Sequence, residues 1–297
     1  MEEKSLFSEG LALVQRLIFT TAIIYIFFSF NTLYSINILE RLHVFSLVVY
    51  IVYQCFVLLV GFCFFRMTIA KNSTTLELFP EIEDKEESSS EESLHLNPFE
   101  KDNIFSGENE MEICSICKTS KPLRSYHCSK CKKCLLLMYK HLDCFDICIG
   151  FTNYKFYIVF LFYSIILSGI GLGAFIYGIS SCDLHFSGGD VICFFAPMVV
   201  ALILQSLLLL IAAYEFVNAV WYVLINQIPE ERKRAGENGK DKDISYDLGM
   251  YENWKMIMGP KWYMWFFPIW STEGDGIKFT SARKLEMEKY QEEIAGS

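Results

Sequence analysis

The sequence lacks an excess of positive charge. Its 297 residues carry 26 lysines and arginines against 35 aspartates and glutamates, which gives a formal net charge of −9 at pH 7. This balance argues against nucleic-acid binding, which depends on cationic contacts with phosphates. Much of the acidic excess lies in one Glu/Ser run at 81–92, so the net charge says little about any binding face.

Two further features are absent. No internal repeat with a fixed period is found along the chain. Residues 1–10 also lack the small-residue cleavage site of a secretory signal peptide, so we expect the apolar segment that follows to be retained.

Apolar residues, in contrast, are abundant. They make up 53% of the chain, and the mean hydropathy is +0.29, which is typical of a multi-pass membrane protein. A helix needs roughly 20 apolar residues to cross the hydrocarbon core. The chain offers four such runs, at 11–34, 44–65, 157–179 and 194–225. We therefore predict an all-α integral membrane protein with four transmembrane helices.

The distribution of lysine and arginine predicts its orientation. Arg66, Lys155 and the run 232–234 flank the spans on one side, whereas the loop 180–193 contains no lysine or arginine. The positive-inside rule then places both termini and the segment 66–156 in the cytosol. We expect an endoplasmic reticulum or Golgi membrane. The Glu/Ser-rich linker 72–112 has too few apolar residues to fold and is expected to be disordered.

A cysteine-rich stretch at 114–148 carries the clearest chemistry. Thiolate and imidazole are the preferred zinc ligands, and two-residue gaps let paired thiolates converge on one ion. Eight ligands suffice for two tetrahedral Cys3His sites. Because the adjacent His127 and Cys128 point in different directions, we expect the two sites to interleave. The eight are Cys114, Cys117, His127, Cys128, Cys131, Cys134, His141 and Cys148.

Two alternatives compete with a pair of zinc sites. The cysteines could be free cytosolic thiols, or they could form a disulfide framework. A disulfide framework suits an oxidising compartment, whereas the segment is predicted to face the reducing side of the membrane.

This stretch resembles the DHHC protein S-acyltransferase (palmitoyltransferase) family. The matching residues are Lys121-Pro122-x-Arg124, His127-Cys128-Ser129-x-Cys131-x2-Cys134 and Cys148-Ile149-Gly150-Phe151-x-Asn153-Tyr154-Lys155-Phe156. The resemblance implies a cytosolic module with two zinc ions. One ion would take Cys114, Cys117, His127 and Cys134, and the other would take Cys128, Cys131, His141 and Cys148.

The chain departs from the family at the catalytic tetrapeptide. Where the family has Asp-His-His-Cys, this chain has Tyr139-Lys140-His141-Leu142. Family enzymes transfer an acyl chain from acyl-CoA to the cysteine of that motif, with the first histidine and the aspartate as base and orienter. Leu142 cannot form a thioester, and Lys140 would be mostly protonated, since an ordinary lysine pKa is about 10.4.

Two motifs beyond the fourth span also resemble parts of the family. These are Tyr246-Asp247-Leu248-Gly249-x3-Asn253-Trp254-x4-Gly259 and Gly274–Phe279. Between them lies a dense aromatic patch, which is expected either to sit at the membrane interface or to be buried against the zinc module. It comprises Trp262, Trp265, Phe266, Phe267, Ile269 and Trp270.

Three functions follow from these features. The first is a family member that has lost acyl transfer and acts as a scaffold, decoy or regulator of protein S-acylation. The second is an active S-palmitoyltransferase that uses acyl-CoA and a surrogate nucleophile, Cys144, whose pKa nearby zinc ligands could lower. The third is a transporter or channel, favoured only by Glu215 inside the fourth span. Membrane lipid, protein substrates and other acyltransferases are the candidate partners.

These features divide the chain into five parts. They are an N-terminal hairpin (1–71), an acidic linker (72–112), a zinc module (113–156), a second hairpin with a lumenal loop (157–226) and a C-terminal region (227–297).

Overall fold

A computed structural model of the chain describes residues 2–41, 44–70, 74–75, 112–180, 188–238 and 245–280. Nearly all of the predicted acidic linker lies outside these residues. In the described part, four helices are long and apolar enough to cross a membrane, which confirms the four predicted spans. The chain is therefore a multi-pass membrane protein. The four helices are α1 (Glu2–Arg41), α2 (Val44–Ile69), α5 (Tyr154–Ser180) and α6 (Gly188–Leu224).

The helices are longer than their apolar runs. The link between the first two apolar runs is largely helical, because α1 continues to Arg41 and α2 begins at Val44. Likewise, α5 begins at Tyr154, before the apolar run at 157. Hydropathy marks the part of a helix that lies in hydrocarbon, whereas backbone hydrogen bonds extend the helix into polar sequence at both ends.

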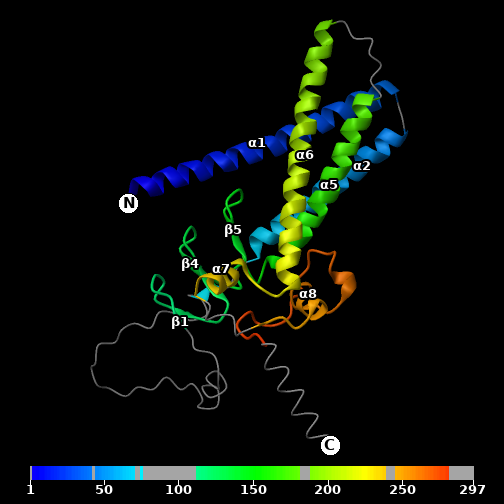
Figure 1. The fold of residues 1–297 in the computed structure, drawn as a ribbon. Helices are drawn as coiled ribbons and strands as arrows, with labels where there is room; N and C mark the ends of the chain where they lie inside the picture. The colour runs from blue at the N-terminus through cyan, green and yellow to red at the C-terminus, as the bar shows by residue number, and fades with distance from the viewer. Residues whose placement is uncertain are drawn as a thin grey trace, which may run out of the picture.

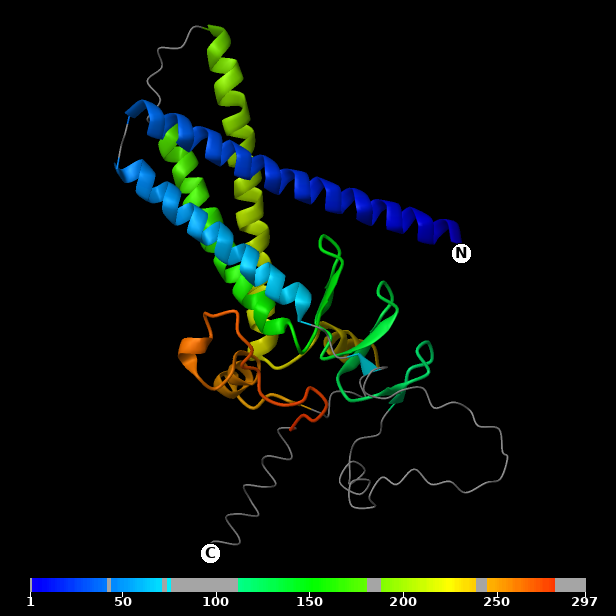
Figure 2. The same cartoon turned by 180° about the vertical axis from the view of Figure 1, so that it is seen from behind.

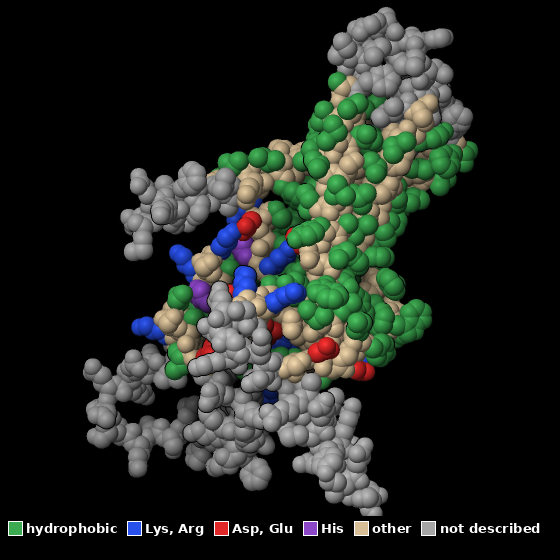
Figure 3. Space-filling view, viewed as in Figure 1, with side chains coloured by type: hydrophobic (Ala, Val, Ile, Leu, Met, Phe, Trp, Pro, Cys, Tyr) green, Lys and Arg blue, Asp and Glu red, His purple; other side chains and the backbone are tan. Residues whose placement is uncertain are grey.

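The membrane helices pack around α5, which contacts both α2 and α6 extensively. Phe30 of α1 stacks on Tyr53 of α2 with ring centroids 3.5 Å apart, and the ring of Phe175 meets Phe30 edge-on. Figure 3 shows hydrophobic side chains along the outside of the bundle. The charged side chains gather at and beyond its lower end in this view. This division matches a bundle in lipid that carries a polar module.

The module consists of three two-stranded antiparallel hairpins. The strands are β1 (Glu112–Ile113), β2 (Ser120–Lys121), β3 (Ser125–Cys128), β4 (Lys133–Leu136), β5 (Lys140–Leu142) and β6 (Ile147–Ile149). The predicted all-α class thus holds for the membrane part. Short hairpins were not predicted, because strands of two to four residues are too short to show a hydrophobic period.

The β5–β6 hairpin joins the module to the bundle (Figure 2). At its turn, the ring of Phe145 packs against Phe19 of α1, Phe64 of α2 and Phe160 of α5, with centroids 4.9–6.0 Å apart. Arg16 of α1 reaches the same turn and pairs with Asp146 at 2.9 Å. The hairpin turn is therefore held by three membrane helices.

The C-terminal region packs at the same end of the bundle (Figure 1). It contains α7 (Pro229–Asn238), α8 (Met250–Met258) and a 3-10 turn η2 (Trp262–Met264). The buried Arg124 of the module ties these parts together. Its guanidinium donates to the side chain of Asn226 at 2.8 Å and pairs with Glu231 at 2.8 Å. This contact fixes the module against the end of α6.

Candidate metal centres and the neighbouring strand

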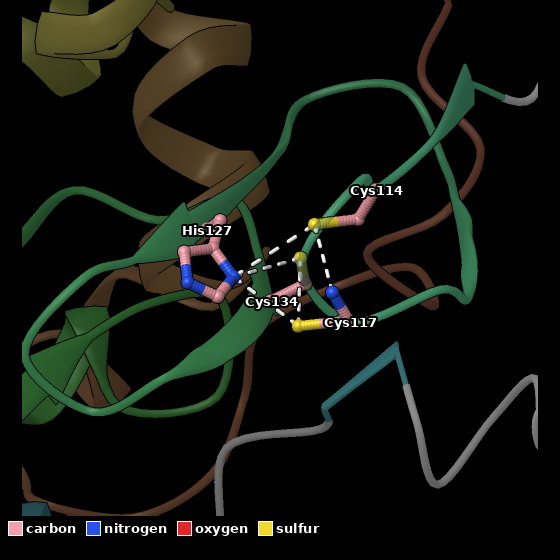
Figure 4. Close-up of side chains that lie close together, drawn as sticks. All are labelled: Cys114, Cys117, His127 and Cys134. Carbon is pink, nitrogen blue, oxygen red and sulfur yellow. Dashed lines mark hydrogen bonds between the residues drawn. The ribbon is translucent and has the colours of Figure 1, made fainter.

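The first cluster combines a Cys-x2-Cys turn with a pair of facing strand residues. Cys114 and Cys117 lie on the turn between β1 and β2, where the Cys117 amide donates to the Cys114 sulfur at 3.5 Å. His127 of β3 and Cys134 of β4 are direct partners across their hairpin. Figure 4 shows the three sulfurs and Nδ1 of His127 converging on one point.

The second cluster repeats this arrangement one hairpin further along the chain. Cys128 and Cys131 lie at the turn between β3 and β4, and the Cys131 amide donates to the Cys128 sulfur at 3.4 Å. His141 of β5 and Cys148 of β6 face each other across the next hairpin. The turn of the β3–β4 hairpin thus supplies two sulfurs to the second cluster, while its strands supply ligands to the first.

The strand conformation of β3 explains why the clusters interleave. Successive side chains of a strand point to opposite faces. His127 therefore faces the first cluster, and the adjacent Cys128 faces the second. The structure brings together the same two sets of four residues that the family resemblance implies, and in each set the ligand atoms lie within 4.8 Å of one another.

The donor atoms fit a tetrahedral zinc ion. With Zn–S near ~2.3 Å, the sulfurs of a tetrahedral site lie about 3.8 Å apart. In the first cluster, Nδ1 of His127 lies 3.2 Å from the Cys117 sulfur and 3.7 Å from that of Cys134. In the second cluster, Nδ1 of His141 lies 3.4 Å from the sulfurs of Cys131 and Cys148. Each cluster could therefore bind one metal ion, and zinc is the ion that this donor set prefers.

The thiols of the two clusters differ in acidity. A hydrogen bond from the Cys148 thiol lowers the pKa of Cys128. Burial raises the pKa of Cys134 to about 12. Metal binding requires thiolates, so an ion that binds either cluster releases the protons that its thiols carry.

Two carboxylates face the outer nitrogen of His141. Asp143 and Asp146 each place an oxygen 3.4 Å from its Nε2. Neither carboxylate is hydrogen-bonded to Nε2, although a carboxylate hydrogen-bonded at that nitrogen would fix the orientation of the ring. Sequence reasoning missed both residues, although their positions two and five residues beyond a ligand were the available signal.

The residues beside His141 in and before β5 are tied into the fold. Tyr139 is only 5% exposed, and its ring stacks on Tyr154 with centroids 4.8 Å apart. Leu142 is 8% exposed and belongs to the hydrophobic core that joins the module to the helices. Between them, Lys140 forms an ion pair with Glu215 of α6.

This ion pair changes the interpretation of Glu215. From the sequence, it was an isolated acid in an apolar span and the sole support for a transporter. In the structure, its carboxylate accepts hydrogen bonds from Lys140 and from the Tyr157 hydroxyl, the latter at 3.1 Å. Glu215 therefore pairs with the module, which removes the support for a transport function.

Cys144 lies in the turn of the β5–β6 hairpin, between Asp143 and Phe145. Of the described cysteines in 112–180, it alone belongs to neither cluster. That neighbouring zinc ligands lower its pKa stays a prediction. Burial raises the pKa of the Cys144 thiol, and the Lys140 ammonium only partly offsets that effect.

Sequence comparison finds one family model and several known proteins that are similar to this chain. Residues 107–234 match the family model described as DHHC palmitoyltransferase. Palmitoyltransferase ZDHHC2 of Rattus norvegicus is 32% identical over 179 residues, which cover 57% of this chain and 46% of the relative. Palmitoyltransferase PFA3 of Candida albicans is 35% identical over 187 residues, which cover 55% and 48%. Palmitoyltransferase ZDHHC20 of Mus musculus is 30% identical over 209 residues, which cover 64% and 53%. The chain thus spans about half the length of these relatives.

Proposed function

We propose a function for this chain from its similarity to the DHHC palmitoyltransferase family, whose model matches residues 107–234. The protein acts as a zinc-stabilised scaffold, decoy or regulator of protein S-acylation, and its own acyl-transfer chemistry is impaired. Its partners are protein substrates or other acyltransferases in the same membrane.

The side chain at position 142 carries this proposal. By its resemblance to the family, this position should hold the cysteine that receives the acyl group, and Leu142 has no atom that can form a thioester. Its neighbours are equally unsuited to the reaction. Lys140 is engaged by Glu215, and Tyr139 is buried among aromatic rings. All three side chains have structural contacts that account for their presence.

A second candidate function is an active acyltransferase that uses Cys144. Two observations favour it: Cys144 lies outside both metal clusters, and its turn is packed among three membrane helices, where an acyl chain would approach. The raised pKa of Cys144 opposes it, because the thiolate is the nucleophile. So does its position two residues beyond Leu142, since a displacement of ~1 Å can cost roughly 100-fold in rate.

The orientation in the membrane belongs to the same proposal. Lys155 and Arg66 lie at the module end of their helices, and this end faces the cytosol by the positive-inside rule. The zinc ions are structural, because the four ligand positions of each cluster are filled by protein side chains. Acyl-CoA is a cofactor only if the second candidate is correct. The membrane is that of the endoplasmic reticulum or the Golgi.

The test is acyl transfer by the purified full chain in detergent. Wild-type protein is incubated with labelled palmitoyl-CoA, and the hydroxylamine-sensitive label is measured on the chain itself and on an added protein thiol. A relative with an intact Asp-His-His-Cys motif is the positive control, and Cys55→Ala, outside both clusters, is the matched control variant. We expect label near background. Turnover onto the substrate that disappears in Cys144→Ala would establish the second candidate instead.

A further inference from the structure

The loop 262–270 presents an unusual surface. Its sequence, Trp-Tyr-Met-Trp-Phe-Phe-Pro-Ile-Trp, contains no charged residue. A contiguous apolar surface of this kind on a folded protein marks a contact with another molecule or with a membrane. Six of the nine side chains are exposed, namely Trp262, Tyr263, Phe266, Phe267, Ile269 and Trp270.

This loop is held in place from behind. The Trp265 indole points inward and donates to the carbonyl of Gly259 at 2.8 Å. Lys155 of α5 donates to the carbonyl of Met264 at 2.9 Å. Gly259 has a φ of +90°, and a Cβ there would lie 2.3 Å from the backbone oxygen of Ser271, so the two ends of the loop meet closely. The aromatic side chains therefore project outward from a fixed frame.

The loop also lies beside a membrane helix. Tyr163 of α5 donates its hydroxyl to the carbonyl of Phe266 at 2.8 Å, and the rings of Phe162 and Phe266 are 5.7 Å apart. Lys155 and Tyr163 are separated by about 12 Å of helical rise. In Figure 1, this orange segment stands beside the module ends of α5 and α6. The loop thus runs alongside the first turns of a candidate span, Tyr154–Tyr177.

We propose that the loop 262–270 is seated in the lipid headgroup and upper acyl region at the module end of the bundle. The loop contacts the half-buried Phe162 of α5 through Phe266, so its exposed side chains lie beside a membrane-spanning helix. Tryptophan and tyrosine prefer this depth, because their rings are apolar and their N–H and O–H groups still reach water. Lys261, exposed at the edge of the loop, is placed to pair with a lipid phosphate.

This seating is independent of whether the chain transfers acyl groups. Of the two alternatives left by the sequence, this seating corresponds to the membrane interface. The other alternative, burial against the zinc module, would cover these side chains. Of the six exposed side chains, Trp270 meets the module at the ring of Phe151, with ring centroids 6.1 Å apart. With the loop in the interface and pinned to α5 by Lys155, the depth of the C-terminal region in the membrane is fixed.

Photolabelling of the full chain in phosphatidylcholine vesicles tests the proposal. One probe phospholipid carries a diazirine near the glycerol, and a second carries it at the end of an acyl chain. Met250 and Tyr251 of α8 are the internal control, because they are 66% and 62% exposed, against 68% for Trp262 and 51% for Tyr263. Leu210 and Ile211, exposed near the middle of the α6 span, report on the hydrocarbon centre.

The shallow probe should label 262–270 several times more than Met250–Tyr251, and the deep probe should favour Leu210–Ile211. The proposal is overturned if the shallow probe labels the loop no more than Met250–Tyr251, whether water, a second copy of the chain or another protein covers it. Stronger labelling of the loop by the deep probe than by the shallow one would also overturn the interfacial placement.

Discussion

Lys140 of β5 is ion-paired with Glu215 of α6, although 75 residues separate them in the sequence. The Tyr157 hydroxyl donates to the same carboxylate oxygen. Glu215 is the one charged residue in the span Ala196–Leu224, so its partner must come from another element. The zinc module supplies that partner. The interface between the module and the membrane bundle thus includes an ion pair.

Removing one member of this pair should destabilise the protein more than exchanging the two charges. In Lys140→Met, Glu215 is left half-buried with only Tyr157 as a donor, and we expect a loss of about 1–3 kcal/mol, at the low end because water reaches the pair. The swap Lys140→Glu with Glu215→Lys should recover part of that loss. The measurement is the thermal unfolding midpoint of the detergent-solubilised protein.

The control for this experiment is an exposed ion pair of the same type. Lys233 pairs with Glu230 one turn away on α7, with 68% and 45% of their side chains accessible. Lys233→Met should therefore change stability by less than about 0.5 kcal/mol. Equal shifts of the unfolding midpoint in Lys140→Met and Lys233→Met would mean that the Lys140–Glu215 pair stabilises the protein no more than an exposed ion pair does.

Zinc removal should unfold the module. Each purified chain is expected to hold two zinc ions, one for each cluster. Structural zinc typically contributes on the order of 10 kcal/mol of apparent binding free energy to folding, so Cys131→Ser or His141→Ala should lower the yield of folded protein. Cys55→Ser, outside both clusters, should leave yield and zinc content unchanged. Elemental analysis that finds less than one zinc ion per chain would refute the metal assignment.

Much of this organisation could be predicted from the sequence, because its signals are local. The spans follow from apolar runs, and two metal sites follow from the Cys-x2-Cys spacing. The division of the eight ligands between the two sites follows from the family resemblance. The unpredicted parts join residues that are far apart. Lys140 and Glu215 each have an unremarkable sequence neighbourhood, and Phe145 gives no sign that it packs among three helices. Such contacts depend on how the module docks, which no local period encodes.

The thiol of Cys144 should react slowly with alkylating agents in the folded protein. Burial raises its pKa, so the folded state keeps the thiol protonated at a pH where the unfolded chain has begun to ionise. By linkage, this contribution favours folding below the ordinary thiol pKa and is lost as pH rises through the higher folded value. Iodoacetamide rates between about pH 7 and 10, mapped by mass spectrometry, should show a midpoint above ~8.5. A midpoint below that value would favour Cys144 as a nucleophile.

The final prediction concerns the recovery of chemistry at 139–142. Leu142→Cys alone should gain little autoacylation, because a thiol with an ordinary pKa of about 8.5 stays mostly protonated. The full reversion (Tyr139→Asp, Lys140→His, Leu142→Cys) should gain more, since it adds a base and its orienter. The full reversion should also lower folding stability, because the new aspartate would replace a ring that is 5% exposed and stacked on Tyr154. We therefore expect the triple variant to fold in lower yield.

The pairing of position 140 with Glu215 suggests a less disruptive variant. In Lys140→His with Leu142→Cys, Tyr139 keeps its stacking, and Glu215 is placed to accept a hydrogen bond from the new imidazole, as an orienter does. This double variant should exceed Leu142→Cys in hydroxylamine-sensitive label per zinc-containing molecule. Adding Glu215→Gln should remove most of that gain. If the double and single variants acylate equally, a histidine at position 140 beside Glu215 does not act as the base of the reaction.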